Sequence, residues 1–199
     1  GLLEEVYPDR EQFFSTPFQA FRTLDGKLIG IPFIFSPRVM FYNPKILAKA
    51  GCNPPSANWT WDEFIGYVDR LRRVMPGRNI FNWHMAPFNW INFVFRAGGQ
   101  LIDPGAADPV MIDDPRTRRG LQLYTELKNH LDIDGRPDYD DFKAGELAFL
   151  LGPREVLCHF KYCGFDDWET VPLPQVPNGC DINAQATDLL CIRKDCSDL

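Results

Sequence analysis

Two short apolar segments of this chain each run into a loop that opens a helix, and this pattern constrains the fold more than any other feature. Residues 80–81 read as a short strand, and Pro87 suits the first turn of the helix that follows. Residues 148–151 form a second, buried strand, after which Pro153 is expected to start another helix. Alternating strands and helices predict an α/β fold, in which helices flank a mixed or parallel sheet. Open α/β sheets bind ligands beyond the carboxyl ends of their strands, so both junctions are candidate sites.

The clearest helix begins after Thr60. Thr60 can cap this helix, and Glu63, three residues later, completes a capping box. Apolar residues recur at helical spacing through the segment until Pro76 and Gly77 end it.

Upstream of this helix we expect a short helix over residues 8–21, a turn at 25–27 and a strand over 28–35. Ser36-Pro37 is expected to interrupt the strand, which then resumes over residues 39–42. Near the end of the chain, further strands are expected over the ranges 169–173 and 189–192.

The chain of 199 residues carries a net charge of −6 and is 45% hydrophobic. This length is typical of one compact domain or of one lobe of a larger protein. A negative chain without a Lys/Arg cluster does not resemble a reader of phosphate backbones, so we expect no nucleic-acid partner. No segment approaches the roughly 18 consecutive apolar residues of a membrane span. The start lacks the features of a secretory signal, so we expect the chain to begin after processing or within a longer protein.

Three pairs of adjacent carboxylates raise the question of acid–base catalysis. They are Asp62-Glu63, Asp113-Asp114 and Asp140-Asp141, and each falls at the start of an expected helix. Negative side chains stabilise the first turn of a helix through its dipole, which accounts for all three pairs. We therefore assign no catalytic residue and expect the protein not to be an enzyme.

The cysteine content is high for a cytosolic protein of this size. The six cysteines are Cys52, Cys158, Cys163, Cys180, Cys191 and Cys196. An even, clustered set favours one or more disulfides in an oxidising compartment. A zinc site is disfavoured because no CxxC pair is present, and Cys158 beside His159 lacks the spacing of a nucleophile and its base. We assign no metal ligand and no cofactor.

Eight short motifs follow one another along most of the chain. They are DGKLIGIP at residues 25–32, FYNPK at 41–45, AG at 50–51, WTWDEF at 59–64, AGG at 97–99, FKAGELAF at 142–149, GP at 152–153 and VPLP at 171–174. In this order and spacing they resemble the family 1 extracellular solute-binding proteins of ABC importers, the maltose-binding-protein-like family.

The resemblance implies a type II periplasmic-binding-protein fold, in which crossing strands join two α/β lobes and the ligand lies between them. On this basis residues 1–35 are a remnant of the N-terminal lobe with its hinge strand, and residues 36–172 are the C-terminal ligand-binding lobe. Residues 173–199 are then the return crossing. We expect a fragment that holds mainly the C-terminal lobe.

Candidate ligand contacts follow from the resemblance where the motifs align. Ser36, with Arg38 nearby, falls in the crossing segment where relatives place a polar ligand contact. Similar sugar binders place a stacking aromatic residue at the start of the helix that Pro87 opens, so the candidates there are Phe88, Asn89 and the flanking Trp83, His84 and Trp90. Core packing is the alternative for Trp83 and Trp90, and hydrogen bonding within the loop is the alternative for His84.

Arg154 follows the GP motif, where a sugar binder often has Trp. This departure favours an acidic sugar or another anion over a neutral oligosaccharide, because Arg can hold a carboxylate with two parallel hydrogen bonds. The alternative is that Arg154 faces solvent at a helix start.

The resemblance implies a carrier that binds a sugar or acidic sugar and delivers it to the ABC permease subunits of a membrane after hinge closure. Such a carrier lies in the periplasm or outside the cell, free or lipid-anchored, and is a monomer at full length. Two other classes stay open. One is a ligand-sensing module of a receptor kinase, and the other is a carbohydrate-active enzyme, which would need two opposed carboxylates.

Overall fold

The computed structural model describes residues 15–23, 25–83, 85–131 and 138–191. The chain divides into two compact units. The smaller unit is built from the residues up to Ser36 and from Gln185 onward, and the larger unit comprises Pro37–Ala184.

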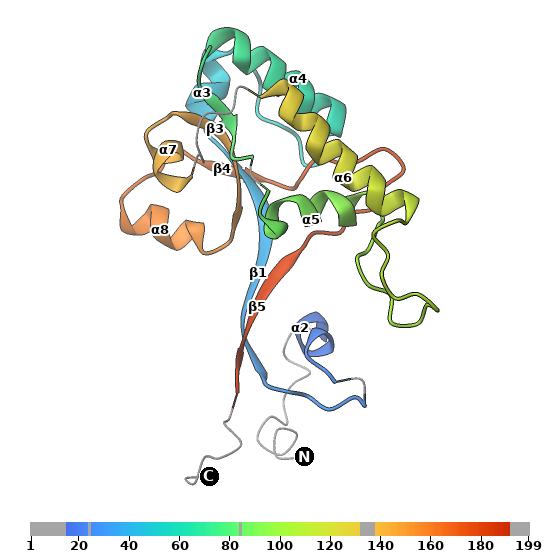
Figure 1. Cartoon of the computed structure of the whole chain (residues 1–199). Coiled ribbons are helices and arrows are strands. Elements are labelled where there is room, and N and C mark those ends of the chain that lie inside the picture. The colour runs from blue at the N-terminus through green and yellow to red at the C-terminus, as the bar shows by residue number, and fades with distance from the viewer. Residues whose placement is uncertain (1–14, 24, 84, 132–137, 192–199) are drawn as a thin grey trace. The chain divides into compact units, whose positions relative to one another are not determined.

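A mixed sheet forms the centre of the larger unit (Figure 1). Its strand order is β2 (Asn79–Phe81), β3 (Leu147–Pro153), β1 (Ile31–Tyr42) and β4 (Glu169–Val171). β2 runs parallel to β3, whereas β1 is antiparallel to both β3 and β4. Arg38 lies opposite Pro153 and Tyr42 lies opposite Phe149, so the part of β1 from Arg38 onward is paired along its length with β3.

Helices cover both faces of this sheet. One face carries α3 (Pro44–Lys49), α4 (Trp61–Val74), α5 (Pro87–Arg96) and α6 (Pro115–Leu127). The short 3₁₀ helix η2 (Lys128–His130) directly follows α6. The other face carries α7 (Tyr139–Lys143) and α8 (Val156–Tyr162). Met40 and Tyr42 point into the core of the first face, and Phe41 into the core of the second, because side chains alternate along a strand. The predicted α/β fold with a mixed sheet is confirmed. No helix in the described parts of the chain is long and apolar enough to cross a bilayer.

The helix starts follow the predicted capping chemistry. Thr60 accepts a hydrogen bond from the backbone N–H of Glu63, whose carboxylate accepts one from the N–H of Thr60 in return. Asp114 accepts from two backbone N–H groups in the first turn of α6, and Asp138 and Asp141 form a second capping box at α7. The carboxylate pairs therefore lie at helix starts, as the sequence predicts.

Two predictions involving proline are wrong. β1 runs unbroken through Ser36 and Pro37, because pairing with β3 starts only at Arg38 and so requires no N–H from the proline. Pro153 does not start a helix either. It is the last residue of β3, and α8 begins at Val156.

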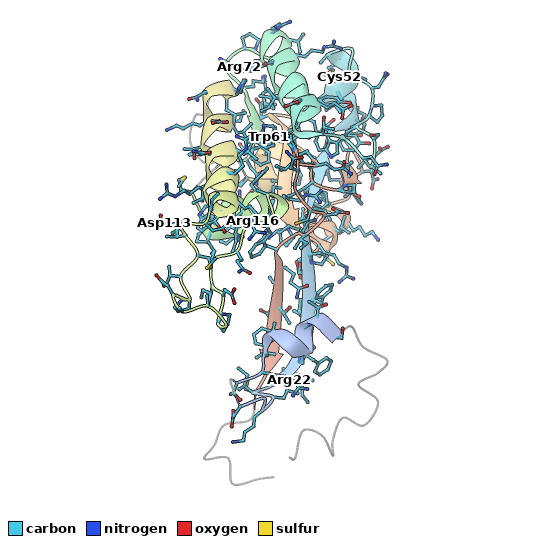
Figure 2. All side chains as sticks on the ribbon, turned by 90° about the vertical axis from the view of Figure 1, so that its right-hand side faces the viewer. Arg22, Cys52, Trp61, Arg72, Asp113 and Arg116 are labelled. Carbon is cyan, nitrogen blue, oxygen red and sulfur yellow. The ribbon has the colours of Figure 1, made fainter. Side chains whose placement is uncertain are left out.

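Aromatic side chains fill much of the larger core. The ring of Phe149 in β3 lies edge-on to Phe64 of α4 at a centroid distance of 5.6 Å. Trp61 packs edge-on against Phe93 of α5 at 5.5 Å, and Figure 2 shows Trp61 in the interior, with Arg72 at the far end of α4. Aromatic residues make up 14% of the chain, and packing in this core accounts for many of them.

The described cysteines are free thiols. Cys52, Cys158, Cys163, Cys180 and Cys191 form no disulfide, so the expected pairing is not found among these five. Cys196 lies outside the described residues.

The smaller unit contains α2 (Ser15–Ala20), one part of β1 and β5 (Gln185–Leu190), which pairs with β1. The predicted turn is present, and Gly26 adopts there a φ of 83°, which favours glycine. The helix expected over residues 8–21 is observed as α2, and its earlier part lies outside the described residues. Phe33 and Leu190 expose more than half of their surface in this unit.

Candidate ligand-binding site

Arg38 occupies a fixed position on β1 in the larger unit. Its backbone N–H donates to the carbonyl of Ala184 at 3.2 Å, and its carbonyl accepts from Asn183 Nδ2 at 3.2 Å. The carbon of its guanidinium lies 4.9 Å from the centroid of the Phe88 ring, which is a cation–π distance. The strand therefore holds a cation against an aromatic ring at the start of α5.

Phe88 is presented by a helix start that buried amides fix. Pro87 is the first residue of α5. Asn89, two residues later, is fully buried, and its side-chain amide donates to the carbonyl of Asn82 at 3.1 Å. Asn82 in turn accepts from the N–H of Leu151 at 2.7 Å and donates to its carbonyl at 3.0 Å. These bonds join α5 to β3, while 49% of Phe88 remains exposed. The ring is thus held in place and still accessible.

Asn92 ties the same turn to the segment beside Arg38. Its Nδ2 donates to the carbonyl of Phe88 at 2.8 Å, and its Oδ1 accepts from the N–H of Ala184 at 3.0 Å. The Asn92 side chain is completely buried, and the two bonds are partly shielded from water. β1, β3, α5 and residues 183–184 therefore meet at one rigid corner of the larger unit.

The charge of Arg38 is incompletely compensated. The side chain is half-buried, and among the described residues it forms no ion pair. Burial lowers the pKa of Arg38 below its ordinary value, and the nearby Tyr139 and Glu155 partly oppose this shift. Burial also raises the pKa of Tyr139, so its phenol stays protonated at neutral pH. The corner therefore offers a cation, a neutral hydroxyl and an aromatic ring.

Three of the predicted site residues have other surroundings. Trp83 donates from Nε1 to the carbonyl of Tyr124 at 2.9 Å and stacks on that ring at 5.5 Å, so it packs against α6. Trp90 is partly buried and packs on the larger core. Ser36 is fully buried and belongs to the smaller unit.

Two further predicted residues complete the set. Arg154 is exposed and directly follows Pro153, the partner of Arg38 across the sheet. His84 lies outside the described residues. The supporting residues Asn82, Asn92 and Asn183 were not predicted from the sequence. Only Asn82 had a local signal for such a role, because it directly follows the strand expected over residues 80–81.

The chain is similar to proteins of a known family. The family model for bacterial extracellular solute-binding proteins matches residues 2–155. The chain belongs to this family. It is 29% identical over 170 residues to a protein of Brucella abortus assigned as a binding protein, covering 76% of this chain and 38% of that protein. A Deinococcus radiodurans protein assigned as an ABC transporter-binding protein is 25% identical over 117 residues, covering 53% of this chain and 26% of that protein.

Solved structures of similar fold are also solute-binding proteins. The GacH receptor of Streptomyces glaucescens, solved unliganded and with acarbose, has a TM-score of 0.77 at 20% identity, covering 96% of this chain and 50% of that one. A Listeria monocytogenes ABC substrate-binding protein in complex with cycloalternan has a TM-score of 0.78 at 20% identity, with coverages of 98% and 52%. UgpB of Mycobacterium tuberculosis with glycerophosphocholine has a TM-score of 0.78 at 18% identity, with coverages of 98% and 51%. These likenesses confirm the type II periplasmic-binding-protein fold, and the chain spans about half the length of these structures.

Proposed function

We propose that the protein carrying this chain is the solute-binding component of an ABC importer and that its ligand is a carbohydrate. The observation that carries this proposal is the family match over residues 2–155. The family consists of binding proteins, and we extend this to the absence of catalysis in this member. Carbohydrate as the ligand class is supported by the relatives solved with acarbose and cycloalternan.

The corner around Arg38 and Phe88 is our candidate for the contact of the larger unit with the ligand. An exposed aromatic ring fixed by buried amides suits the apolar face of a sugar ring, since rigid stacking surfaces bind with little loss of conformational entropy. Arg154 remains a candidate contact of the larger unit. The larger unit then corresponds to the C-terminal lobe, and closure of two lobes over the ligand is the state that the permease recognises.

The half-buried, unpaired guanidinium favours a ligand with an anionic group. A half-buried cation that Tyr139 and Glu155 compensate only in part is costly, and a carboxylate held by two hydrogen bonds would relieve that cost. We therefore place an acidic sugar ahead of a neutral one. The site of action is the periplasm or the cell exterior, with ABC permease subunits as partners and a monomeric carrier.

The test is a titration of the full-length protein with matched sugars: glucose against glucuronate, and galactose against galacturonate. Within each pair only the C6 group differs, so the difference in affinity reports on the carboxylate. We expect a uronate to bind more tightly than its neutral partner, and Arg38→Gln to weaken uronate binding by about tenfold or more. Arg73→Gln, an exposed arginine on α4, is the matched control and should leave affinity unchanged.

Two negative results would have different meanings. Folded protein that binds no sugar or related polyol would contradict the carbohydrate carrier as a whole. Neutral and acidic sugars that bind equally, with no effect of Arg38→Gln, would contradict only the anionic preference.

A further inference from the structure

A cavity lies in the larger unit beside the C-terminal end of β1, away from Arg38. It has a volume of about 510 Å³, within the usual range for small-molecule sites. Asn43, directly after β1, belongs to its lining. Asn43 lies five positions after Arg38 along extended chain, which corresponds to about 16 Å. The cavity is therefore distinct from the candidate ligand-binding site.

The charged side chains of this cavity are mostly positive. Its lining contains the cations Lys45, Lys49, Arg78 and Lys143 and the carboxylates Glu146 and Asp167. These six groups leave a local excess of two positive charges in a chain whose net charge is −6. The potential in the cavity thus opposes that of the chain as a whole, and it favours an anion.

The ion pairs within the lining are exposed and easily exchanged. Lys45 Nζ lies 2.7 Å from Asp167, with 69% and 40% of the two side chains exposed. Arg78 pairs with Glu146, and both side chains are nearly half exposed. Exposed pairs of this kind contribute little to stability, so either cation can turn to a bound anion at small cost.

Lys49 adds a cation without a competing partner. It lies one helical turn after Lys45 on α3, so both project from the same side of the helix. Among the described residues Lys49 forms no hydrogen bond or ion pair. Lys143 enters from α7 and pairs at 2.7 Å with Asp140, which is not part of the lining.

Apolar side chains form another part of the wall. Ile46, Val74, Met75 and Phe165 belong to the lining, and half of Val74 is exposed. Inorganic ions alone would leave this apolar surface uncovered, whereas an anion with a carbon skeleton would cover it. The cations and the apolar wall together match a molecule that has two or more negative groups on a small organic body.

We propose that this cavity, here named the basic cavity, binds a small organic polyanion. Lys49 of α3 and Arg78, in the turn between α4 and β2, bind its negative groups, and the apolar wall holds its carbon skeleton. A polycarboxylate and a phosphorylated sugar share this chemistry. The proposal does not depend on the ligand of the Arg38 corner.

The experiment is a calorimetric titration of the full-length protein with two probes, citrate and glucose 6-phosphate, at an ionic strength of about 0.15 M. Inorganic phosphate is the comparison ligand. We expect one organic anion to bind more tightly than inorganic phosphate, and the double variant Lys49→Gln/Arg78→Gln to weaken that binding by about tenfold or more. The identity of the better probe distinguishes a carboxylate ligand from a phosphate ligand.

Two control variants make the result specific. Lys161→Gln removes an exposed lysine of α8 outside the basic cavity and should leave the affinity unchanged. Arg38→Gln should also leave it unchanged. Absence of binding by both probes, equal weakening in Lys161→Gln, or loss of binding in Arg38→Gln would each overturn the proposal.

Discussion

The two ends of β1 in the larger unit hold their cations in opposite ways. At one end Arg38 is half-buried, and its backbone is fixed by bonds to Asn183 and Ala184 while its guanidinium lies against Phe88. At the other end Lys45 and Arg78 of the basic cavity are carried by long, exposed side chains in ion pairs that water can replace. The first arrangement is preorganised and selective, and the second is adaptable. Substitutions at the two ends should therefore differ in what they change.

The largest effect is expected from the amide that supports the rigid end. Asn82→Ala leaves the N–H and the carbonyl of Leu151 without their buried partner. Each unsatisfied buried group costs about 1–3 kcal/mol, so the free energy of unfolding should fall by about 2–6 kcal/mol. Urea unfolding of the full-length protein measures this change.

Asn129→Ala, at an exposed position in η2, is the matched control and should change the unfolding free energy by less than about 0.5 kcal/mol. If Asn82→Ala lowers the unfolding free energy no more than this control does, the buried amides do not hold the corner. The proposed contrast between the two ends of β1 would then be wrong.

This support network shows where sequence reasoning stops. Helix caps such as Thr60 with Glu63, and the proline start of α5, were predictable because both partners lie within one helical turn. The bonds of Asn82 to Leu151 and of Asn92 to Ala184 join residues that are 69 and 92 positions apart. No local pattern specifies such partners, so the corner itself was visible only once the chain was folded.

Proline and glycine illustrate the same limit. Pro37 and Pro153 were expected to break elements, although Pro37 lies within β1 and Pro153 is the last residue of β3. Gly120 allows α6 to approach α5 closely, since a β-carbon there would lie 2.4 Å from the Cα of Val94. The identity of a glycine does not reveal such a neighbour. The candidate site residues Arg38 and Phe88 were chosen by family resemblance, and their mutual contact was not predicted.

A smaller effect, on binding rather than stability, is expected for the ring at the rigid end. Phe88→Ala removes the exposed stacking surface and should weaken sugar binding by about tenfold. Stability should change little, because half of Phe88 is already in water. Tyr162→Ala, which removes a 92% exposed aromatic ring on α8, should change neither property. Titration and urea unfolding of the same three proteins separate these outcomes, and unchanged sugar affinity in Phe88→Ala would remove the ring from the site.

The smallest effect is expected beside the basic cavity, as a change in acid sensitivity. A hydrogen bond from Lys143 lowers the pKa of Asp140 below its ordinary value. When folding lowers the pKa of a carboxyl, the resulting stabilisation is fully present above the pKa of that carboxyl in the unfolded chain, about 4. It is lost as the pH falls through the lower pKa of the folded protein. Asp140→Asn should therefore reduce slightly the loss of stability between neutral pH and about pH 3. Unfolding free energies measured across this range test it.

Lys143→Gln removes the other partner of that pair and should reproduce the same change. The double variant should then show no more than either single variant, because both substitutions delete one shared interaction. Additive effects would mean that Asp140 and Lys143 act independently. The charged side chains beside the basic cavity would then not act as ion pairs. The contrast between them and the fixed guanidinium of Arg38 would no longer hold.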